Sequence, residues 1–331
     1  MKASLVVTSI NKPNKILRRL AKFSKINGWE FIIIGDRKSP NDFKLNYTNF
    51  LSLRDQKKLN FNFSKICPEN SYARKNIGYL IAMKNFKVIV ETDDDNYPKT
   101  SFFKKRELDH HAITINNKGW INIYDLFLSK KKFIWPRGLP LDQLNNKIKV
   151  SKSKVKNSFY IQQGVCDNNP DVDSIFRLIN DKINIKFLNK KFNLNKSLSP
   201  FNSQNTTWFK EAFPLMYLPV TCTMRCTDIW RGLIALYLFR LNSKKILFHG
   251  PTTIQYRNPH NILNDFVDEI PMFQDSNFLI QELSKLNLKK GISFYSENLL
   301  KIYRRLIDLK IFEKKELIFL RAWLEDININ F

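Results

Sequence analysis

The sequence predicts an α/β protein with a mixed, mostly parallel sheet flanked by helices and followed by a helical C-terminal extension. Apolar, β-branched runs alternate with helical patterns over the first hundred residues. An acidic segment directly follows one of these runs, and Leu and Ile recur with Lys and Glu between them from Asp275 to the end. With 331 residues, of which 43% are hydrophobic, the chain can bury a substantial core.

The first hundred residues provide the elements of a parallel sheet. Short β-branched runs predict strands, and apolar residues spaced three or four apart predict helices. In order, we expect a strand at Ser4–Ile10, a helix through about Ile26, a strand at Trp29–Ile34, a further candidate strand at Asn49–Ser52, a helix at Asn70–Lys84 and a strand at Phe86–Val90. This order is typical of βαβ units.

The remainder of the chain is less regular. Leu144–Asn157 is rich in Lys and Asn and reads as a solvated loop, whereas Asp171–Leu178 and Thr227–Leu241 read as helices. From Asp275 onwards we expect an amphipathic helical tail that packs against the rest of the protein.

The chain carries 55 Lys and Arg against 30 Asp and Glu, a net charge of +25. Such a charge can indicate nucleic acid, an anionic membrane surface or a phosphorylated substrate. The lysines are spread along the chain, and the joint excess of Lys, Asn, Ile and Phe is typical of AT-rich codon usage. This pattern argues against a nucleic-acid partner and favours an anionic ligand or a peripheral membrane contact.

No sequence segment predicts a membrane span or a disulfide framework. The longest apolar run, Gly232–Phe239, is bounded by arginines and falls short of the roughly 18–20 residues that span a bilayer. The four cysteines form no CxxC pair. We expect a cytoplasmic protein without structural zinc.

Asp93, Asp94 and Asp95 form the sharpest local feature. They follow a buried-type strand, and the carboxyl ends of parallel strands are where α/β proteins bind ligands. Three adjacent carboxylates repel one another unless a cation lies among them, and Mg²⁺ or Mn²⁺ prefers such oxygen ligands. We expect Asp93 and Asp95 to hold a metal that also binds a diphosphate. The alternative is a solvated acidic turn.

Two cations and an amide stand near the start of the predicted helix at Asn70–Lys84. Arg74, Lys75 and Asn76 would lie where helix N–H groups favour anions, so they are candidate phosphate contacts. Gly78 would let this helix pack closely on the sheet. The alternative reading of Arg74 and Lys75 is a solvated helix face.

Asp228, Trp230 and Arg231 are the candidate catalytic residues. Asp228 at a helix start could accept a proton from a sugar hydroxyl, and Trp230 could pack on a sugar ring. The alternatives are that Asp228 caps the helix and that Trp230 belongs to the core. His249 and His260 are further candidates for metal or phosphate contacts.

With these residues in view, the chain resembles the STELLO-like glycosyltransferase family, which has the GT-A arrangement. The resemblance covers about residues 4–270 and is carried, in the family's order, by VVTSI (Val6–Ile10), IIIGD (Ile32–Asp36), NSYARKNIGYLIAM (Asn70–Met83), ETDDDN (Glu91–Asn96), QQGVCDNNPDVDSIFRL (Gln162–Leu178), SPFNSQNT (Ser199–Thr206), PVTCTMRCTDIWRG (Pro219–Gly232) and RNPHN (Arg257–Asn261). A weaker similarity connects the acidic triplet and the Asp-Ile-Trp segment to reversibly glycosylated polypeptides, which act as UDP-arabinopyranose mutases.

The resemblance implies a glycosyltransferase that uses a nucleotide sugar, most simply a UDP-sugar, with Mn²⁺ or Mg²⁺ on a DxD-type motif. Residues 1–270 would form the catalytic domain, with a nucleotide-sugar-binding half at 1–100 and an acceptor half at 101–270, and residues 271–331 the extension. The residues expected to contact donor or metal are Thr8, Ser9, Asp36, Arg74, Lys75, Asn76, Asp93, Asp94, Asp95 and His260. The acceptor would be a glycan or a lipid-linked saccharide, as in polysaccharide biosynthesis.

Two other functions remain open from the sequence. The first is a UDP-sugar mutase or autoglycosylating protein. The second is a non-catalytic basic protein that binds polyanions, although an intact acidic triplet would repel phosphates unless a metal is retained.

Overall fold

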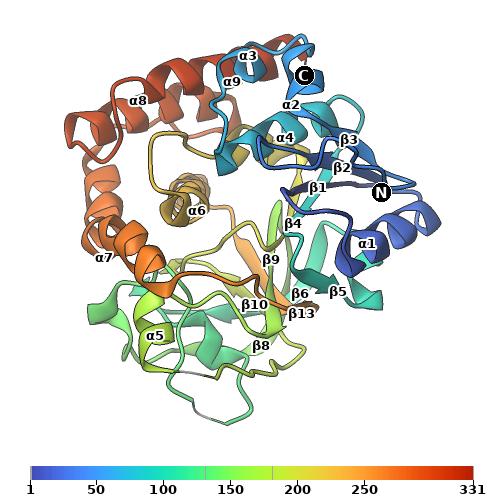
Figure 1. Ribbon diagram of the computed structural model, residues 1–331. Coiled ribbons are helices and arrows are strands. Elements are labelled where there is room, and N and C mark those ends of the chain that lie inside the picture. The colour runs from blue at the N-terminus through green and yellow to red at the C-terminus, as the bar shows by residue number, and fades with distance from the viewer. Residues whose placement is uncertain (1, 131, 181, 331) are drawn as a thin grey trace.

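A mixed sheet runs through the molecule and is flanked by helices (Figure 1). The computed structural model describes residues 2–130, 132–180 and 182–330, and eleven strands within these ranges join in the order β3-β2-β1-β4-β12-β9-β13-β10-β6-β8, with β5 beside β13. The strands are β1 (Ser4–Thr8), β2 (Glu30–Ile34), β3 (Asn49–Leu51), β4 (Val88–Thr92), β5 (Asn96–Pro98), β6 (Asp109–Ile115), β8 (Val150–Ser158), β9 (Ile161–Asn168), β10 (Lys191–Leu194), β12 (Asn205–Phe209) and β13 (Ile246–Gln255), while β7 (Gly119–Trp120) pairs with β11 (Ser197–Leu198) separately.

The α-helices are α1 (Lys15–Ile26), α2 (Leu53–Lys57), α3 (Asn62–Ile66), α4 (Lys75–Met83), α5 (Ser174–Ile179), α6 (Met224–Leu241), α7 (Ile262–Lys285), α8 (Tyr295–Asp308) and α9 (Glu316–Asn330). They confirm the predicted fold class, an α/β protein with a helical C-terminal extension.

The N-terminal part of the sheet is parallel, as predicted. β3, β2, β1 and β4 pair in parallel register, with Ser4 opposite both Glu30 and Ile89. α4 packs tightly on this part, since a Cβ placed on Gly78 would come within 2.6 Å of the Val6 side chain. Gly78 therefore allows the close helix–sheet approach that the sequence suggested.

Beyond β4 the sheet becomes mixed. β12 lies antiparallel between β4 and β9, and β9 pairs in parallel with β13. This insertion places segments from the second half of the chain beside the strand that precedes the acidic triplet.

The predicted loop at Leu144–Asn157 is wrong in part, because Val150–Ser158 forms β8, an antiparallel edge strand on β6. Most of its side chains are exposed, so no alternation of apolar residues marks it. Lys152, Lys154 and Lys156 are exposed along this edge, where lysines discourage pairing with another chain.

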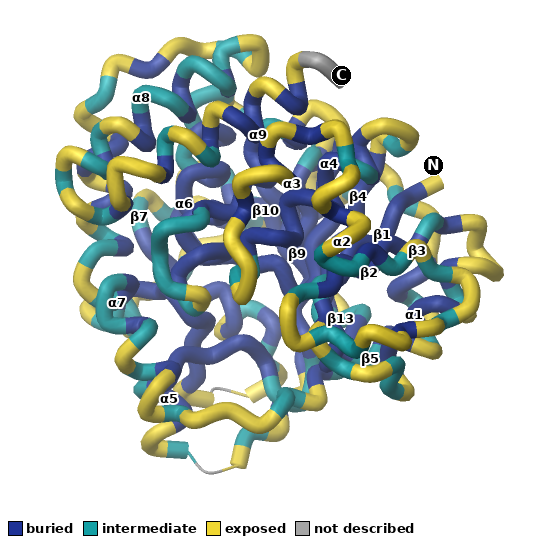
Figure 2. Tube along the Cα trace, turned by 45° about the horizontal axis from the view of Figure 1, so that its top comes forward, coloured by how far each residue is buried: buried dark blue, intermediate teal, exposed yellow. Residues whose placement is uncertain are grey.

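The C-terminal helices pack against the rest of the protein. α6 is buried along most of its length, whereas α7 and α8 keep exposed outer faces (Figure 2). α9 lies against α3, where the Asp326 carboxylate accepts hydrogen bonds from the amides of Asn62 and Phe63, both at 2.8 Å. α7 is continuous across residues 270 and 271, where the predicted division of the chain lies.

Within the described ranges, none of the helices combines the length and apolar character that crossing a bilayer requires.

Candidate functional site

A cleft of about 620 Å³ opens at the carboxyl ends of β1, β2 and β4. This volume lies in the range of small-molecule sites. One side, which we call the acidic wall, carries Asp93, Asp94 and Asp95. The other side, the arginine wall, carries Arg137, Arg225 and Arg257 with their acidic partners Asp171, Asp228, Asp265 and Glu269.

Asp94 is held by neutral donors from two segments. One carboxylate oxygen accepts hydrogen bonds from Ser9 Oγ at 2.5 Å and Asn11 Nδ2 at 2.9 Å, and the other from Asn258 Nδ2 at 3.2 Å. The backbone carbonyl of Asp94 also accepts a bond from Asn14, the residue that caps α1. The triplet is thus anchored to the loop after β1.

Asp93 is paired with Lys75 from within the protein. Lys75 Nζ lies 3.0 Å from Asp93 Oδ1, and the Lys75 side chain is fully buried. Tyr72 donates a second hydrogen bond to the same oxygen at 2.9 Å. Desolvation raises the pKa of Asp93 above its usual value, and Lys75 only partly opposes this shift.

Asp95 has the least support of the three carboxylates. Its contacts from Gln255 Nε2, the Asn258 amide and Asn96 Nδ2 are all 3.3 Å long. Burial, followed by the neighbouring charge of Asp93, raises the pKa of Asp95 to about 6. A cation at this position would relieve both effects.

The residues of the acidic wall fit a Mg²⁺ or Mn²⁺ ion in their chemistry. Carboxylate and amide oxygens surround the position, and two buried amide oxygens next to Asp95, Asn96 Oδ1 and Gln255 Oε1, have no hydrogen-bond partner among the described residues. No group of three or more His, Cys, Asp or Glu side chains is assembled for a metal in the described part of the chain. A cation here would therefore need additional oxygen ligands.

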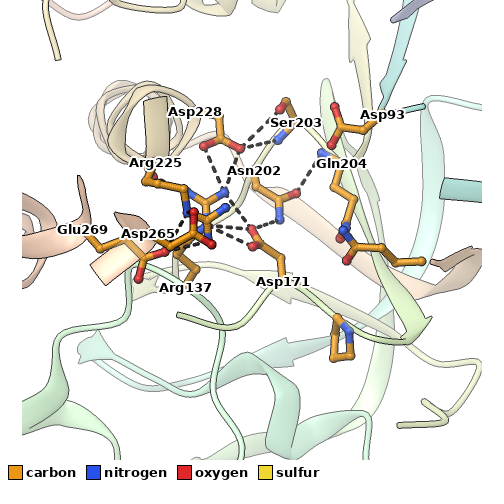
Figure 3. Close-up of polar contacts among 12 residues, drawn as sticks. Asp93, Arg137, Asp171, Asn202, Ser203, Gln204, Arg225, Asp228, Asp265 and Glu269 are labelled. Atoms are coloured by element: carbon orange, nitrogen blue, oxygen red, sulfur yellow. Dashed lines mark hydrogen bonds and ion pairs between the residues drawn. The ribbon is translucent and has the colours of Figure 1, made fainter. Parts of the chain in front are cut away.

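Arg137 joins two carboxylates on the arginine wall (Figure 3). Its Nη2 lies 2.8 Å from Asp171 Oδ2 and 3.1 Å from Asp228 Oδ1. Ser203 adds bonds from its amide and its hydroxyl to Asp228 Oδ2, both at 3.2 Å. Burial alone would raise the pKa of Asp171, but the charge and hydrogen bonds of Arg137 outweigh it and lower that pKa below its usual value.

Arg225 and Arg257 extend this wall toward α7. Arg225 pairs with Glu269 at 2.6 Å, and Arg257 with Asp265 at 2.5 Å. His260 Nδ1 lies 3.3 Å from the other Asp265 oxygen. Burial would raise the pKa of Asp265, yet the hydrogen bond from His260 and the charges of both arginines lower it.

A chain of hydrogen bonds connects the two walls. Asp93 accepts a hydrogen bond from the Tyr72 hydroxyl, which lies 2.5 Å from Ser203 Oγ, and the Ser203 backbone amide donates to Asp228. The carboxylate expected to act on the acceptor and the acidic triplet are therefore held by one network.

The cleft brings together nine of the residues singled out in the sequence. These are Thr8, Ser9, Asp36, Arg74, Asp93, Asp94, Asp95, Asp228 and His260. Their roles toward a ligand stay predictions. Asp36 also shapes the loop before α4, because its carboxylate accepts hydrogen bonds from the amides of Asn70 and Ser71.

Arg74 and Asn76 are not available as the phosphate contacts we predicted. The Arg74 guanidinium is buried and donates to Gln56 and to the Cys67 carbonyl, although the residue borders the cleft. Asn76 is fully buried and exchanges hydrogen bonds with the backbone of Leu218.

Trp230 and Arg231 were predicted to be catalytic, but the structure places both in the core. Trp230 is 2% exposed and packs edge-on against Phe312. Arg231 is 1% exposed and binds Glu91 with both arms of its guanidinium, at 2.9 and 3.0 Å. Neither residue borders the cleft.

His249 does not line the cleft. Its Nδ1 contacts the Gly250 carbonyl at 2.8 Å, and no hydrogen bond to a carboxylate is seen for it among the described residues. Burial lowers the pKa of His249 to about 4, so the imidazole is neutral near pH 7. Its predicted metal or phosphate role finds no support in this position.

Sequence reasoning missed the arginine wall and the connecting residues. Arg137 stands in a Trp-Pro-Arg-Gly segment that reads as a turn, and Asp171 reads as a helix cap. Tyr72 lies in the NSYARKNIGYLIAM segment and Ser203 in the SPFNSQNT segment, but neither was predicted to have a role in the site. The RNPHN segment was the one signal that could have indicated Arg257 and Asn258.

Comparisons with known proteins find similarity to glycosyltransferases. A model described as STELLO glycosyltransferases matches residues 225–331, the part that holds α6 to α9. Two proteins of Arabidopsis thaliana, the probable glycosyltransferases STELLO1 and STELLO2, are each 27% identical to the chain over 97% of its length.

The chain spans less than half of these relatives, 44% of each. Among solved structures, glucosyl-3-phosphoglycerate synthase from Mycobacterium tuberculosis is 11% identical, with a TM-score of 0.41 over 88% of this chain and 81% of that chain. The family match over residues 225–331 and the similarity along nearly the whole chain confirm the resemblance to the STELLO glycosyltransferases seen in the motifs.

Proposed function

We propose that the protein transfers a sugar from a nucleotide-diphosphate sugar, a UDP-sugar, to a hydroxyl group of a glycan or lipid-linked acceptor, with Mn²⁺ or Mg²⁺ as cofactor. One observation carries the proposal: a single cleft brings the acidic triplet after β4 opposite the buried carboxylate of Asp228. The STELLO relatives, which are named probable glycosyltransferases, support the same reaction class.

The donor would lie along the acidic wall. Thr8, Ser9 and Asp36 border the cleft where β1 and β2 end, which suits the base and ribose of a nucleotide. The diphosphate would then reach the triplet. A divalent cation held there by Asp95 would supply positive charge that stabilises a diphosphate leaving group.

The acceptor would lie along the arginine wall. In the transfer, the bond between the anomeric carbon and the diphosphate oxygen breaks, and a bond to the acceptor oxygen forms. Asp228 takes the proton from the acceptor hydroxyl, and the diphosphate leaves with the electron pair of the broken bond. Arg137 and Ser203 keep the Asp228 carboxylate oriented toward this task.

The test is a thermal-shift panel of nucleotides and nucleotide sugars, each with Mn²⁺, Mg²⁺ or EDTA. A ligand that binds only the folded protein raises the melting temperature as its concentration exceeds the dissociation constant. We expect UDP and at least one UDP-sugar to raise it with metal and not with EDTA. A protein that responds to none of the nucleotides under any condition would contradict the proposal.

A second measurement separates transfer from the mutase alternative. We expect radioactive sugar from the matching UDP-sugar to appear in an added acceptor. Label that accumulates on the protein itself, with no acceptor added, would support autoglycosylation instead.

A further inference from the structure

Two buried amide side chains beside Asp95 leave their oxygen atoms without a hydrogen-bond partner among the described residues. Asn96 is fully buried and Gln255 is 6% exposed and borders the cleft. Asn96 Oδ1 and Gln255 Oε1 have no partner among the residues that the structure describes. Buried amide oxygens are normally hydrogen-bonded, so two neighbouring exceptions at a ligand site need an explanation.

The backbone fixes both amides around the same carboxylate. Asn96 and Gln255 stand opposite each other in the antiparallel pair of β5 and β13. The Tyr256 amide donates to the Asp95 carbonyl at 2.9 Å, which keeps the end of β13 against the triplet. Both side-chain nitrogens contact the Asp95 carboxylate at 3.3 Å. These contacts are long, and each leaves an oxygen unused.

The other two carboxylates of the triplet already have strong partners. Asp93 binds the ammonium group of the buried Lys75, and Asp94 accepts three hydrogen bonds from neutral donors. Asp95 is therefore the carboxylate with the most capacity for an added cation. A single carboxylate needs further oxygen ligands, because Mg²⁺ and Mn²⁺ favour sites with six oxygens.

We propose that Gln255, together with Asn96, supplies neutral amide oxygens to the divalent cation that Asp95 holds. This inference rests on the proposed function, since it concerns the cofactor of the same cleft. When a cation takes the Asp95 carboxylate, the amide nitrogens lose their acceptor. The terminal amide torsion is broad, so each amide can present its oxygen instead. Two neutral ligands would also leave coordination positions for a diphosphate.

The experiment measures Mn²⁺ binding directly, by the electron paramagnetic resonance of free Mn²⁺, with and without UDP. Gln255→Leu removes the oxygen, and we expect its Mn²⁺ affinity to fall about ten-fold or more. Gln255→Glu keeps two oxygens at the same place, and we expect it to bind Mn²⁺ at least as tightly as the unsubstituted protein.

A role for Gln255 as a hydrogen-bond donor alone predicts a different result. The donated bond competes with a cation for the Asp95 carboxylate, so Gln255→Leu would then bind Mn²⁺ as tightly as the unsubstituted protein or more tightly. That result would overturn the proposal. The matched control is Gln162→Leu, which removes a buried glutamine of β9 that donates to the Glu107 and Phe159 carbonyls and does not border the cleft. We expect its Mn²⁺ affinity to be unchanged.

The melting temperature of each variant without metal shows whether it folds. Mn²⁺ affinity in Gln255→Leu equal to that of the unsubstituted protein would overturn the role of Gln255 and leave the proposed function standing. Absence of Mn²⁺ binding by the unsubstituted protein, even with UDP, would overturn the metal-dependent function and this inference together.

Discussion

The two walls of the cleft hold the same kind of side chain in opposite electrostatic conditions. On the acidic wall, the pKa values of Asp93 and Asp95 are raised, mainly because the protein desolvates them. On the arginine wall, the pKa values of Asp171 and Asp265 are lowered, because nearby arginines and hydrogen bonds outweigh burial. Burial is common to both walls, so the difference lies in how fully cations and hydrogen bonds of the protein offset it, and Lys75 offsets it only in part for Asp93.

This difference indicates what each wall needs from a ligand. The arginine wall carries its own positive charge and is complete without a cation. The acidic wall has Lys75 beside Asp93, but Asp95 has only long contacts to neutral groups. A divalent cation would therefore act on one wall only, and substitutions on the two walls should have separable effects.

The largest effect is expected from Asp95→Ala on the acidic wall. The variant removes the carboxylate that we expect to hold the cation, so the metal-dependent rise in melting temperature with UDP should disappear. The melting temperature without ligand should not fall, because a carboxyl group with a raised pKa is unfavourable to the fold in its ionised form. Asp109→Ala, an exposed carboxylate on β6, is the control. A response to UDP and Mn²⁺ equal to that of the unsubstituted protein would refute the assignment.

Asp228→Asn should reduce transfer while leaving donor binding unchanged. Loss of a general base typically lowers the rate about 10²–10⁴-fold. The measurement is the steady-state transfer rate with the donor found in the thermal-shift panel, together with the affinity for UDP and Mn²⁺. A variant that loses donor affinity in step with the rate would show that the walls are not separable.

Arg137→Met should destabilise the protein by about 3–5 kcal/mol, because it leaves buried charges on Asp171 and Asp228 without their cation. The measurement is the free energy of unfolding in urea. Arg257→Met is the matched control and should cost less, since Asp265 keeps contacts with His260 and Arg225. Equal losses in the two variants would argue against the bridging role of Arg137.

The smallest effect is a pH dependence of metal binding. With a pKa of about 6, Asp95 becomes protonated as the pH falls, so Mn²⁺ affinity should drop about ten-fold per pH unit below that value. Because its folded-state pKa is raised, the stabilisation that Asp95 gives the metal-free protein is present below about pH 4 and lost as the pH rises through 6.

The contribution of Asp171 to stability changes with pH in the opposite direction. Its pKa is lowered, so its stabilisation is present above about pH 4 and is lost as the pH falls toward the lower folded-state value. Melting temperatures between pH 2 and 8, with Mn²⁺ and with EDTA, check both signs. A Mn²⁺ effect as large at pH 5 as at pH 7.5 would contradict the pKa of Asp95.

The acidic wall could be predicted from the sequence because its parts are contiguous. The triplet follows directly on a strand, and Thr8, Ser9 and Asp36 end two others, so parallel pairing alone brings them to one edge. The arginine wall could not be predicted this way. Arg137 meets Asp171 and Asp228 across separations of 34 and 91 residues, which only the completed fold sets.

The rotation per residue in α6 explains why Asp228 borders the cleft as predicted and why Trp230 does not. Asp228 faces the cleft, and Trp230 lies two positions on, about 200° around the helix, so it faces the core. Arg231 extends from the same helix toward β4, where Glu91 neutralises it. The sequence shows these residues side by side, but it does not show which face of α6 meets the cleft.

The contact between α9 and α3 has a consequence for how the protein is made. Asp326 receives the amide of Asn62 across a separation of 264 residues. At about 5–20 residues per second, synthesis of that interval takes roughly 13–50 s. The N-terminal part of the sheet therefore emerges from the ribosome long before the helix that completes its packing, and its apolar surface under α3 stays open to chaperones during that time.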